Sequence, residues 1–194
     1  MQIQRFAEHR PMPWLNGRGE SLEIASDRGS DDNWTWRLAL APVMADGPFS
    51  KIDGVDRQLV MVEGRGMTLT IDRKVYECKP LEIVSFRGEA MTSAQLNRGP
   101  IRDINLMTRR GSCGGSLEVV RGGAKIASLE NYRADGNVTD VLARIVVAVE
   151  PTECVVGAES CDLEFGDAIS CAVDDDLRVV SGVAVAATII GEQR

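Results

Sequence analysis

The sequence has one histidine, His9, in 194 residues. Catalytic zinc, non-haem iron and copper sites usually use two or three imidazole ligands, so this count argues against all three. A Ser-His-Asp triad would have to use His9, and nothing around it resembles a nucleophile elbow. We predict that His9 is a solvent-exposed residue near the start of the chain.

Cysteine forms none of the usual metal or redox patterns. The five cysteines are odd in number and include no C-x-x-C pair, and their spacing excludes a zinc ribbon. This usage is typical of reduced, mostly buried thiols in a cytosolic protein, and one buried disulfide stays open as an alternative. The residues are Cys78, Cys113, Cys154, Cys161 and Cys171.

Positive charge and long apolar segments are also scarce. Lys and Arg number 22 against 29 Asp and Glu, which gives a net charge of −7. Non-specific binding to nucleic acid needs a basic surplus instead. The most apolar stretch, residues 179–190, is too short to span a bilayer, and residues 1–14 lack the apolar part of a secretory signal. We expect a cytoplasmic protein with neither nucleic acid nor membrane as a partner.

The pattern that is present is that of a β protein. Short runs of Val, Ile and Leu alternate with turn residues such as D-G, G-R-G and R-G-G. Residues 138–147, with Asn137 as a candidate cap, are the best helix candidate, but they read equally well as a strand. The predicted strands include residues 58–62, 67–71, 81–86, 117–120, 145–149, 168–173 and 183–190.

A weak internal repeat runs through these strands. Residues 59–70 and 79–86 (LVMVEGRGMTLT and KPLEIVSF) match residues 145–156 and 163–171 (IVVAVEPTECVV and LEFGDAISC). The G-D-A-I turn of the second copy resembles the G-D turn of cupin barrels, where a flexible backbone is needed before a strand. Chance similarity between strands of any β protein is the alternative.

The repeat predicts an all-β, cupin-like double-stranded β-helix with two related β-barrel halves, a bicupin. Residues 1–194 would form a single cupin-like domain with an N-terminal half of about 1–120 and a C-terminal half of about 121–194. Metal-dependent cupins typically hold the ion with histidines and a carboxylate, and neither copy contains a histidine. We therefore predict no metal and no other cofactor.

Two segments in the first half carry polar residues that a plain β core does not explain. Residues 13–25 are a glycine-rich loop and an alternating run, and they lack the P-loop pattern. In residues 36–40, Arg37 shares a strand face with Ala39. An inward-facing Arg37 must be paired or face a polar pocket, because burial of an unpaired charge is costly. The alternative is a surface lattice of turns around Asp56 and Arg57.

A third segment, residues 101–111, alternates cleanly. Asp103, Asn105, Met107 and Arg109 share one face of the predicted strand. Such a face fits the wall of a pocket for a small polar ligand, such as a carboxylate held by Arg109. A polar strand facing solvent explains the pattern equally well.

Together the three segments resemble the HutD/Ves family. They read PWLNGRGESLEIA, WRLALAPVMADGPFSKIDGVDR and RDINLMTRRG, in the order of the family's pieces. The resemblance implies a cupin-like fold of two barrel halves and a role as an accessory or regulatory protein of histidine utilisation. It also implies binding of small carboxylic acids, and no enzymatic activity is established for the family. The sequence departs from the family pattern at Leu15, Arg18, Leu22 and Ala39.

The residues and the resemblance together define a candidate ligand site. Arginines would bind a carboxylate through bidentate hydrogen bonds, and an asparagine would donate or accept a further hydrogen bond. An aromatic ring would form one side of the pocket. The predicted ligand-binding residues are Trp14, Asn16, Glu23, Arg37, Asp46, Phe49, Ser50, Asp103, Asn105 and Arg109.

Three functions from different classes are consistent with this site. The first is a metal-free binding protein for a small anionic metabolite, such as an intermediate of histidine breakdown. The second is a metal-independent isomerase or hydrolase in which Glu23, Asp46 or Asp103 acts as general acid or base. The third is an interaction protein without a small ligand, in which exposed sheet edges form a homodimer. The sequence favours a non-enzymatic role without deciding it.

Overall fold

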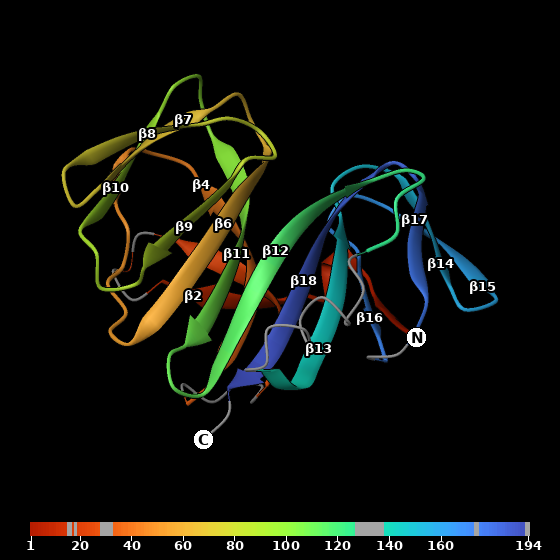
Figure 1. Ribbon diagram of the computed structural model, residues 1–194. Helices are drawn as coiled ribbons and strands as arrows, with labels where there is room; N and C mark the ends of the chain where they lie inside the picture. Colours follow the sequence, from red (N-terminus) through yellow and green to blue (C-terminus); the bar gives the residue numbers. More distant parts are fainter. Residues whose placement is uncertain (15–16, 18, 28–32, 127–137, 173–174, 193–194) are drawn as a thin grey trace. The chain divides into compact units, whose positions relative to one another are not determined.

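The computed structural model describes residues 1–14, 17, 19–27, 33–126, 138–172 and 175–192 (Figure 1). The chain divides into two compact units. Residues 10–110 form one, named the N-terminal unit here. Residues 1–9 and 111–194 form the other, named the C-terminal unit, so the first residues of the chain fold with its second half.

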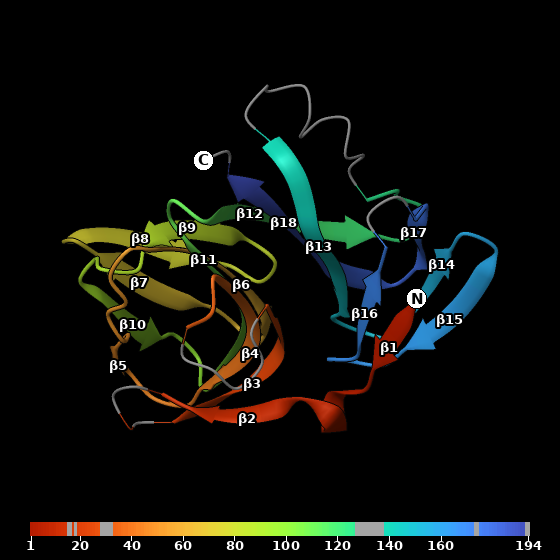
Figure 2. The same ribbon diagram turned by 90° about the horizontal axis from the view of Figure 1, so that it is seen from below.

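The N-terminal unit consists of antiparallel strands in two sheets. The six-stranded sheet has the order β2-β3-β4-β11-β6-β9, and the four-stranded sheet has the order β5-β10-β7-β8 (Figure 2). The bounds are β2 Arg10–Pro13, β3 Glu20–Ser26, β4 Trp36–Val43, β5 Gly47–Pro48, β6 Val55–Glu63, β7 Met67–Ile71, β8 Lys74–Cys78, β9 Ile83–Arg87, β10 Thr92–Leu96 and β11 Ile101–Arg109.

The C-terminal unit also has two antiparallel sheets, β1-β16-β13-β18-β12 and β15-β14-β17. The ambiguous segment beginning at residue 138 is strand β13. The bounds are β1 Gln2–Gln4, the 3-10 helix η1 Phe6–Glu8, β12 Cys113–Arg121, β13 Val138–Ala148, β14 Thr152–Val156, β15 Glu159–Leu163, β16 Ala168–Cys171, β17 Leu177–Ser181 and β18 Val183–Glu192.

The two units share one order of strand pairing. In the N-terminal unit β11, β6 and β9 are neighbours and β10, β7 and β8 are neighbours. In the C-terminal unit β18, β13 and β16 are neighbours and so are β17, β14 and β15. The first copy of the sequence repeat falls on β6, β7 and β9, and the second falls on β13, β14 and β16. The weak sequence repeat therefore corresponds to a repeated topology.

Each unit has its own apolar core, built by period-two alternation. In β7 the residues Met67, Leu69 and Ile71 are buried while Thr68 and Thr70 are not, because successive side chains of a strand point to opposite faces. These residues join Leu59 and Met61 of β6 in the core of the N-terminal unit. The alternation seen in the sequence thus sets which face of each sheet is apolar.

The start of the chain is held by the G-D turn of the second repeat. Gly166 has φ +80°, and its backbone N–H bonds to the carbonyl of Ala148. The carboxylate of Asp167 accepts the backbone N–H of Phe6 at 2.8 Å and pairs with Arg5 at 2.7 Å. These contacts hold the segment between β1 and β2 against the turn.

The prediction of a solvent-exposed histidine is wrong for this reason. His9 is 4% exposed, and its Nε2 lies 2.7 Å from the carbonyl oxygen of Gly166. Pairing of β1 with β16 brings the N-terminal segment to this turn, a long-range effect that terminal position in the sequence does not reveal.

All five cysteines are free thiols. Cys78, Cys113 and Cys154 are buried, and Cys161 and Cys171 are partly buried. Burial raises the pKa of the Cys154 thiol to about 12, which keeps it protonated near neutral pH. The described residues include no helix with the length and hydropathy that a membrane span requires.

Replacement of Gly166 by alanine should destabilise the C-terminal unit. An added Cβ would lie 2.4 Å from Cδ2 of Phe6, and the φ of +80° adds backbone strain. We expect Gly166→Ala to lower the free energy of unfolding by about 2–4 kcal/mol in urea titrations.

Gly157→Ala is the matched control for this change. Gly157 also has a positive φ, of +62°, but an added Cβ meets nothing within 4 Å. Its loss should be limited to backbone strain, about 1 kcal/mol. Equal losses for the two variants would contradict the role of the Phe6 contact.

Candidate functional site

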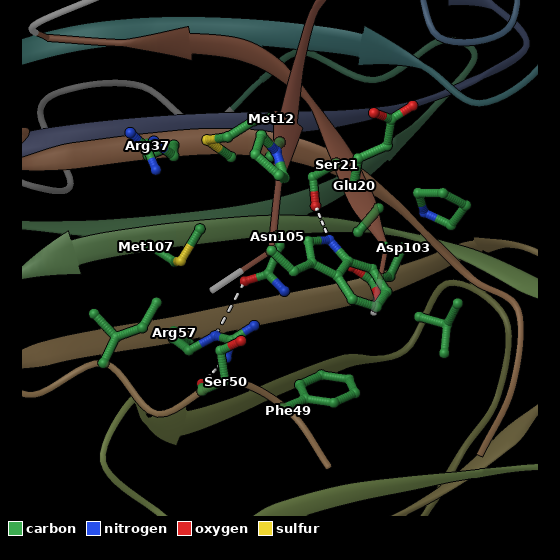
Figure 3. A pocket seen from close by; sticks show the side chains of 18 of the residues that line it. Met12, Glu20, Ser21, Arg37, Phe49, Ser50, Arg57, Asp103, Asn105 and Met107 are labelled. Atoms are coloured by element: carbon green, nitrogen blue, oxygen red, sulfur yellow. Dashed lines mark hydrogen bonds between the residues drawn. The ribbon is translucent and has the colours of Figure 1, made fainter. Parts of the chain in front are cut away.

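The N-terminal unit contains a pocket of about 650 Å³ on the inner face of its six-stranded sheet (Figure 3). Strands β2, β3, β4, β6 and β11 and the connection from β4 to β6 supply its lining. The volume falls in the range of about 300–1,000 Å³ that small-molecule sites occupy.

Strand register places the polar residues of the pocket floor in rows. Arg37, Met107 and Arg57 lie side by side on β4, β11 and β6. The next rows along β11 centre on Asn105 and Asp103.

Small residues beside the polar floor leave room for a ligand. Ala39 is the β4 neighbour of Asn105, and Ala41 is the β4 neighbour of Asp103. Both alanines line the pocket and are buried. Larger side chains at these two positions would fill the space above Asn105 and Asp103, so the hollow follows from the alternation of small and polar residues on adjacent strands.

Arg57 is the buried cation of the pocket. It is 8% exposed, and its guanidinium carbon lies 5.3 Å from the ring of Phe49 and 5.0 Å from that of Phe86. Its Nε donates to Oδ1 of Asn105 at 3.4 Å and its Nη1 to the carbonyl of Ser50 at 3.3 Å (Figure 3). Burial lowers the pKa of Arg57 to about 10, still well above neutral, so the group is charged and desolvated.

Asp103 is the buried acid of the pocket. It is 1% exposed, and burial raises the pKa of its carboxyl to about 7. The positive charge of Arg57 and a hydrogen bond with Asn105 oppose this rise. Near neutral pH the protonated and ionised forms of Asp103 are therefore both populated.

Arg37 also lines the pocket and is buried, and its ion-pair partner lies outside the lining. Its Nε lies 2.9 Å from Oε2 of Glu23, and its guanidinium carbon lies 4.8 Å from the ring of Trp34. The other oxygen of Glu23 accepts from Arg10 at 2.6 Å. The sequence argument that Arg37 must be paired or face a polar pocket is met in both ways.

Aromatic side chains contribute to the apolar part of the lining. The indole of Trp14 donates to Oγ of Ser21 at 2.7 Å and packs on Gly19, where an added Cβ would lie 3.0 Å from the ring. Because Gly19 has no side chain, the backbone of the glycine-rich loop can approach the Trp14 ring closely. Arg109 stacks on Trp34 with its guanidinium carbon 5.3 Å from the ring.

Eight of the ten residues predicted from the sequence line the pocket: Trp14, Arg37, Asp46, Phe49, Ser50, Asp103, Asn105 and Arg109. Glu23 does not line it and instead holds Arg37 and Arg10. Asn16 lies outside the described residues. Asp46 is exposed at the rim, where its Oδ1 accepts the backbone N–H of Leu96 at 2.7 Å.

Arg57 is not among the ligand-binding residues predicted from the sequence, where it appears only in the alternative of a surface lattice of turns. The signal was available, because alternation back from Met61 and Leu59 puts Arg57 on the same inward face of β6. The surface pairing belongs to its neighbour Asp56, which binds Arg110 at 2.5 Å.

In the described part of the C-terminal unit, the positions equivalent to the polar floor differ in residue type. Strand register places Arg144 of β13 where the N-terminal unit has Arg57. The positions equivalent to Asn105 and Asp103, however, are Ala186 and Ala184. The described part of the chain also contains no cluster of His, Cys, Asp and Glu that could hold a metal ion.

The family model described as HutD matches residues 6–181 of this sequence. The chain belongs to the HutD family. An uncharacterized 21.2 kDa protein in the hutC 3′ region of Pseudomonas putida is 36% identical over 109 residues, which is 55% of this chain and 57% of that relative. Protein Ves of Escherichia fergusonii is 33% identical over 119 residues, 59% and 62% of the two chains. The chain thus spans about three fifths of the length of these relatives.

Solved structures extend the HutD likeness to the fold. HutD from Pseudomonas fluorescens SBW25, in a formate condition, has a TM-score of 0.75 at 28% identity, with 100% of this chain and 98% of that chain covered. A cupin 2 conserved barrel domain protein from Leptotrichia buccalis has a TM-score of 0.54 at 9% identity, with 89% and 88% covered, which shows the fold alone. The predicted HutD/Ves family and the all-β, cupin-like class are confirmed.

Loss of the Glu23 charge should destabilise the protein, because it leaves the buried guanidinium of Arg37 without its ion pair. We expect Glu23→Gln to lower the free energy of unfolding by about 3 kcal/mol in urea titrations. Glu63→Gln is the control, because Glu63 pairs with Arg102 at 2.9 Å on the surface and the loss there should stay below about 1 kcal/mol. Similar losses at both sites would show that Glu23 does not compensate Arg37.

Proposed function

We propose that the protein is a metal-free binding protein for a small carboxylate metabolite, with its site in the pocket of the N-terminal unit. The observation that carries this proposal is Arg57. Its guanidinium is buried at the pocket and forms no ion pair with a carboxylate among the described residues. A buried cation that is held by neutral oxygens and aromatic rings favours an anionic ligand.

The remainder of the lining suits a small acid. Asn105 and Ser50 supply polar groups at Arg57, and Trp14 and Phe49 supply apolar walls. Few polar groups that converge in a mostly apolar pocket are the usual arrangement of a small-molecule site. Arg109, which the sequence analysis favoured as the carboxylate ligand, lies at Trp34 and becomes a secondary contact in this proposal.

Membership of the HutD family supports the metabolic context. We propose an accessory or regulatory role in histidine utilisation, in the cytoplasm, with an intermediate of histidine breakdown as the ligand. The two units would be the two barrel halves of a bicupin, of which the N-terminal one binds. If no acid binds in the experiment below, that result would favour the alternative of an interaction protein that forms a homodimer and has no small ligand.

A thermal-shift screen tests the binding function. The panel contains formate, histidine, urocanate, N-formylglutamate, glutamate and unrelated dicarboxylates, each with and without EDTA. A ligand at a hundredfold excess over its Kd stabilises the native state by about 2.7 kcal/mol. We expect a selective rise in Tm with one acid that EDTA does not change. A fall in Tm with EDTA alone would contradict the metal-free site.

Loss of Arg57 should abolish most of this binding. Arg57→Gln removes the charged hydrogen bonds to the ligand, so we expect the Kd for the best acid to rise about 10- to 100-fold in calorimetric titrations. Arg102→Gln is the control, because Arg102 pairs with Glu63 on the surface and should leave the Kd unchanged. Unchanged affinity in Arg57→Gln would contradict the proposed function.

One observation favours an enzyme as the second candidate. The pKa of Asp103 is raised to about 7 inside a pocket, and such a value suits a general acid or base at neutral pH. Of the three acids considered from the sequence, Glu23 is held in ion pairs and Asp46 is exposed. Turnover of any acid or sugar of a broad panel that is lost in Asp103→Asn would establish this candidate. Binding without turnover would leave the first function.

A further inference from the structure

One oxygen of the pocket floor has no partner. Oδ1 of Asp103 is buried and accepts no hydrogen bond from the residues that the structure describes. Asp103 lies two residues from Asn105 on the same face of β11, so their Cα atoms are about 7 Å apart. Because Asn105 contacts Arg57, the unpartnered oxygen belongs to the same site as the buried cation.

A bound carboxylate changes the charge balance of this site. The side chains of this site carry the positive charge of Arg57 and the partial negative charge of a half-ionised Asp103. An anion held by Arg57 would face an ionised Asp103 on the same buried floor of the pocket. Two carboxyl groups that share a desolvated site do not both stay ionised, because like charges raise the pKa of one of them.

We propose that Asp103 is a ligand-binding residue in its protonated form, and that its O–H donates to the carboxylate that Arg57 holds. Each bound anion then brings one proton from solvent onto Asp103, and no other bond forms or breaks. The proposal rests on the carboxylate-binding function and adds to it how the carboxylate is recognised. The ligand binds as an anion, one proton binds to Asp103 at the same time, and this position therefore recognises a single carboxylate group.

The neighbouring charges are consistent with this role. On β6 the charge that acts on Asp103 is Arg57, which opposes the rise of its pKa. On β8 the thiol of Cys78 is buried, and its own pKa is raised by burial, so it stays neutral. On β4, Arg37 is paired with Glu23. The other charged groups of the lining, Glu20, Asp46 and Arg109, are at least partly exposed.

The proposal predicts how affinity depends on pH. Below the pKa of free Asp103, about 7, the proton is already present and affinity is constant. Above it the proton must be taken up, so Kd rises toward tenfold per pH unit. A residue with a purely structural role would leave the affinity independent of pH in this range.

Titration with acetate tests this dependence. Acetate stays ionised between pH 6 and 8, and the fluorescence of Trp14 and Trp34, which line the pocket, reports its binding. At constant ionic strength we expect the Kd of the wild type to be about tenfold higher at pH 8 than at pH 6, given the pKa of about 7 for Asp103. Asp103→Asn should bind with the same Kd at both pH values.

Glu20→Gln is the matched control, because Glu20 is an exposed carboxylate of the same lining. It should keep the tenfold ratio of the wild type. Calorimetry in two buffers of different ionisation enthalpy counts protons directly. At pH 8 we expect uptake of nearly one proton per acetate by the wild type and none by Asp103→Asn.

The outcomes separate this inference from the function on which it rests. A wild-type Kd that does not change with pH, or no proton uptake, overturns the role of Asp103 even if Arg57→Gln still loses acetate. Unchanged acetate binding in Arg57→Gln overturns the binding function itself. The proton count on the wild type needs no variant, so it decides the matter even if Asp103→Asn does not fold.

Discussion

The guanidinium of Arg57 sets the constraint on which the N-terminal unit depends, because a buried charge must be compensated by its surroundings. Its packing against two phenylalanine rings and its bonds to Asn105 and the Ser50 carbonyl supply part of that compensation. None of these neighbours carries a full negative charge, and Asp103 carries only part of one near neutral pH. This incomplete compensation is the basis of the proposal that an anion from outside the chain binds at this site.

The fold makes this arrangement possible by pairing β4, β11 and β6 side by side in one sheet. Beside the polar residues of β11 stand the alanines of β4, and this alternation leaves a hollow where a packed core would otherwise continue. The second buried arginine, Arg37, is satisfied differently, by Glu23 from the neighbouring strand β3. The charge of Arg37 is thus paired within the sheet, and that of Arg57 is not paired among the described residues, although both residues lie in the same row of the sheet.

Comparison of the two units shows how one strand order can carry a polar pocket in one unit and alanines at the equivalent positions in the other. The C-terminal unit keeps an arginine, Arg144, at the position of Arg57, but it has alanines at the positions of Asn105 and Asp103. Its inner residues Val146, Ile169 and Ala186 belong to an apolar core. With the same topology, the presence of an acid and an amide on one strand distinguishes a polar pocket from a packed interior.

The sequence by itself determined the β class, most strands, the family and the shared strand face that carries Asp103, Asn105 and Arg109, because alternation and motifs are local signals. The sequence could not decide whether that face lines a pocket or faces solvent, because this depends on which strands pair with each other. Tertiary structure alone brought Arg57 to Asn105, moved Glu23 out of the lining to Arg37, and buried His9 against Gly166. Each of these contacts joins residues distant in sequence, and burial, which sets the charge state of Asp103, exists only once they have formed.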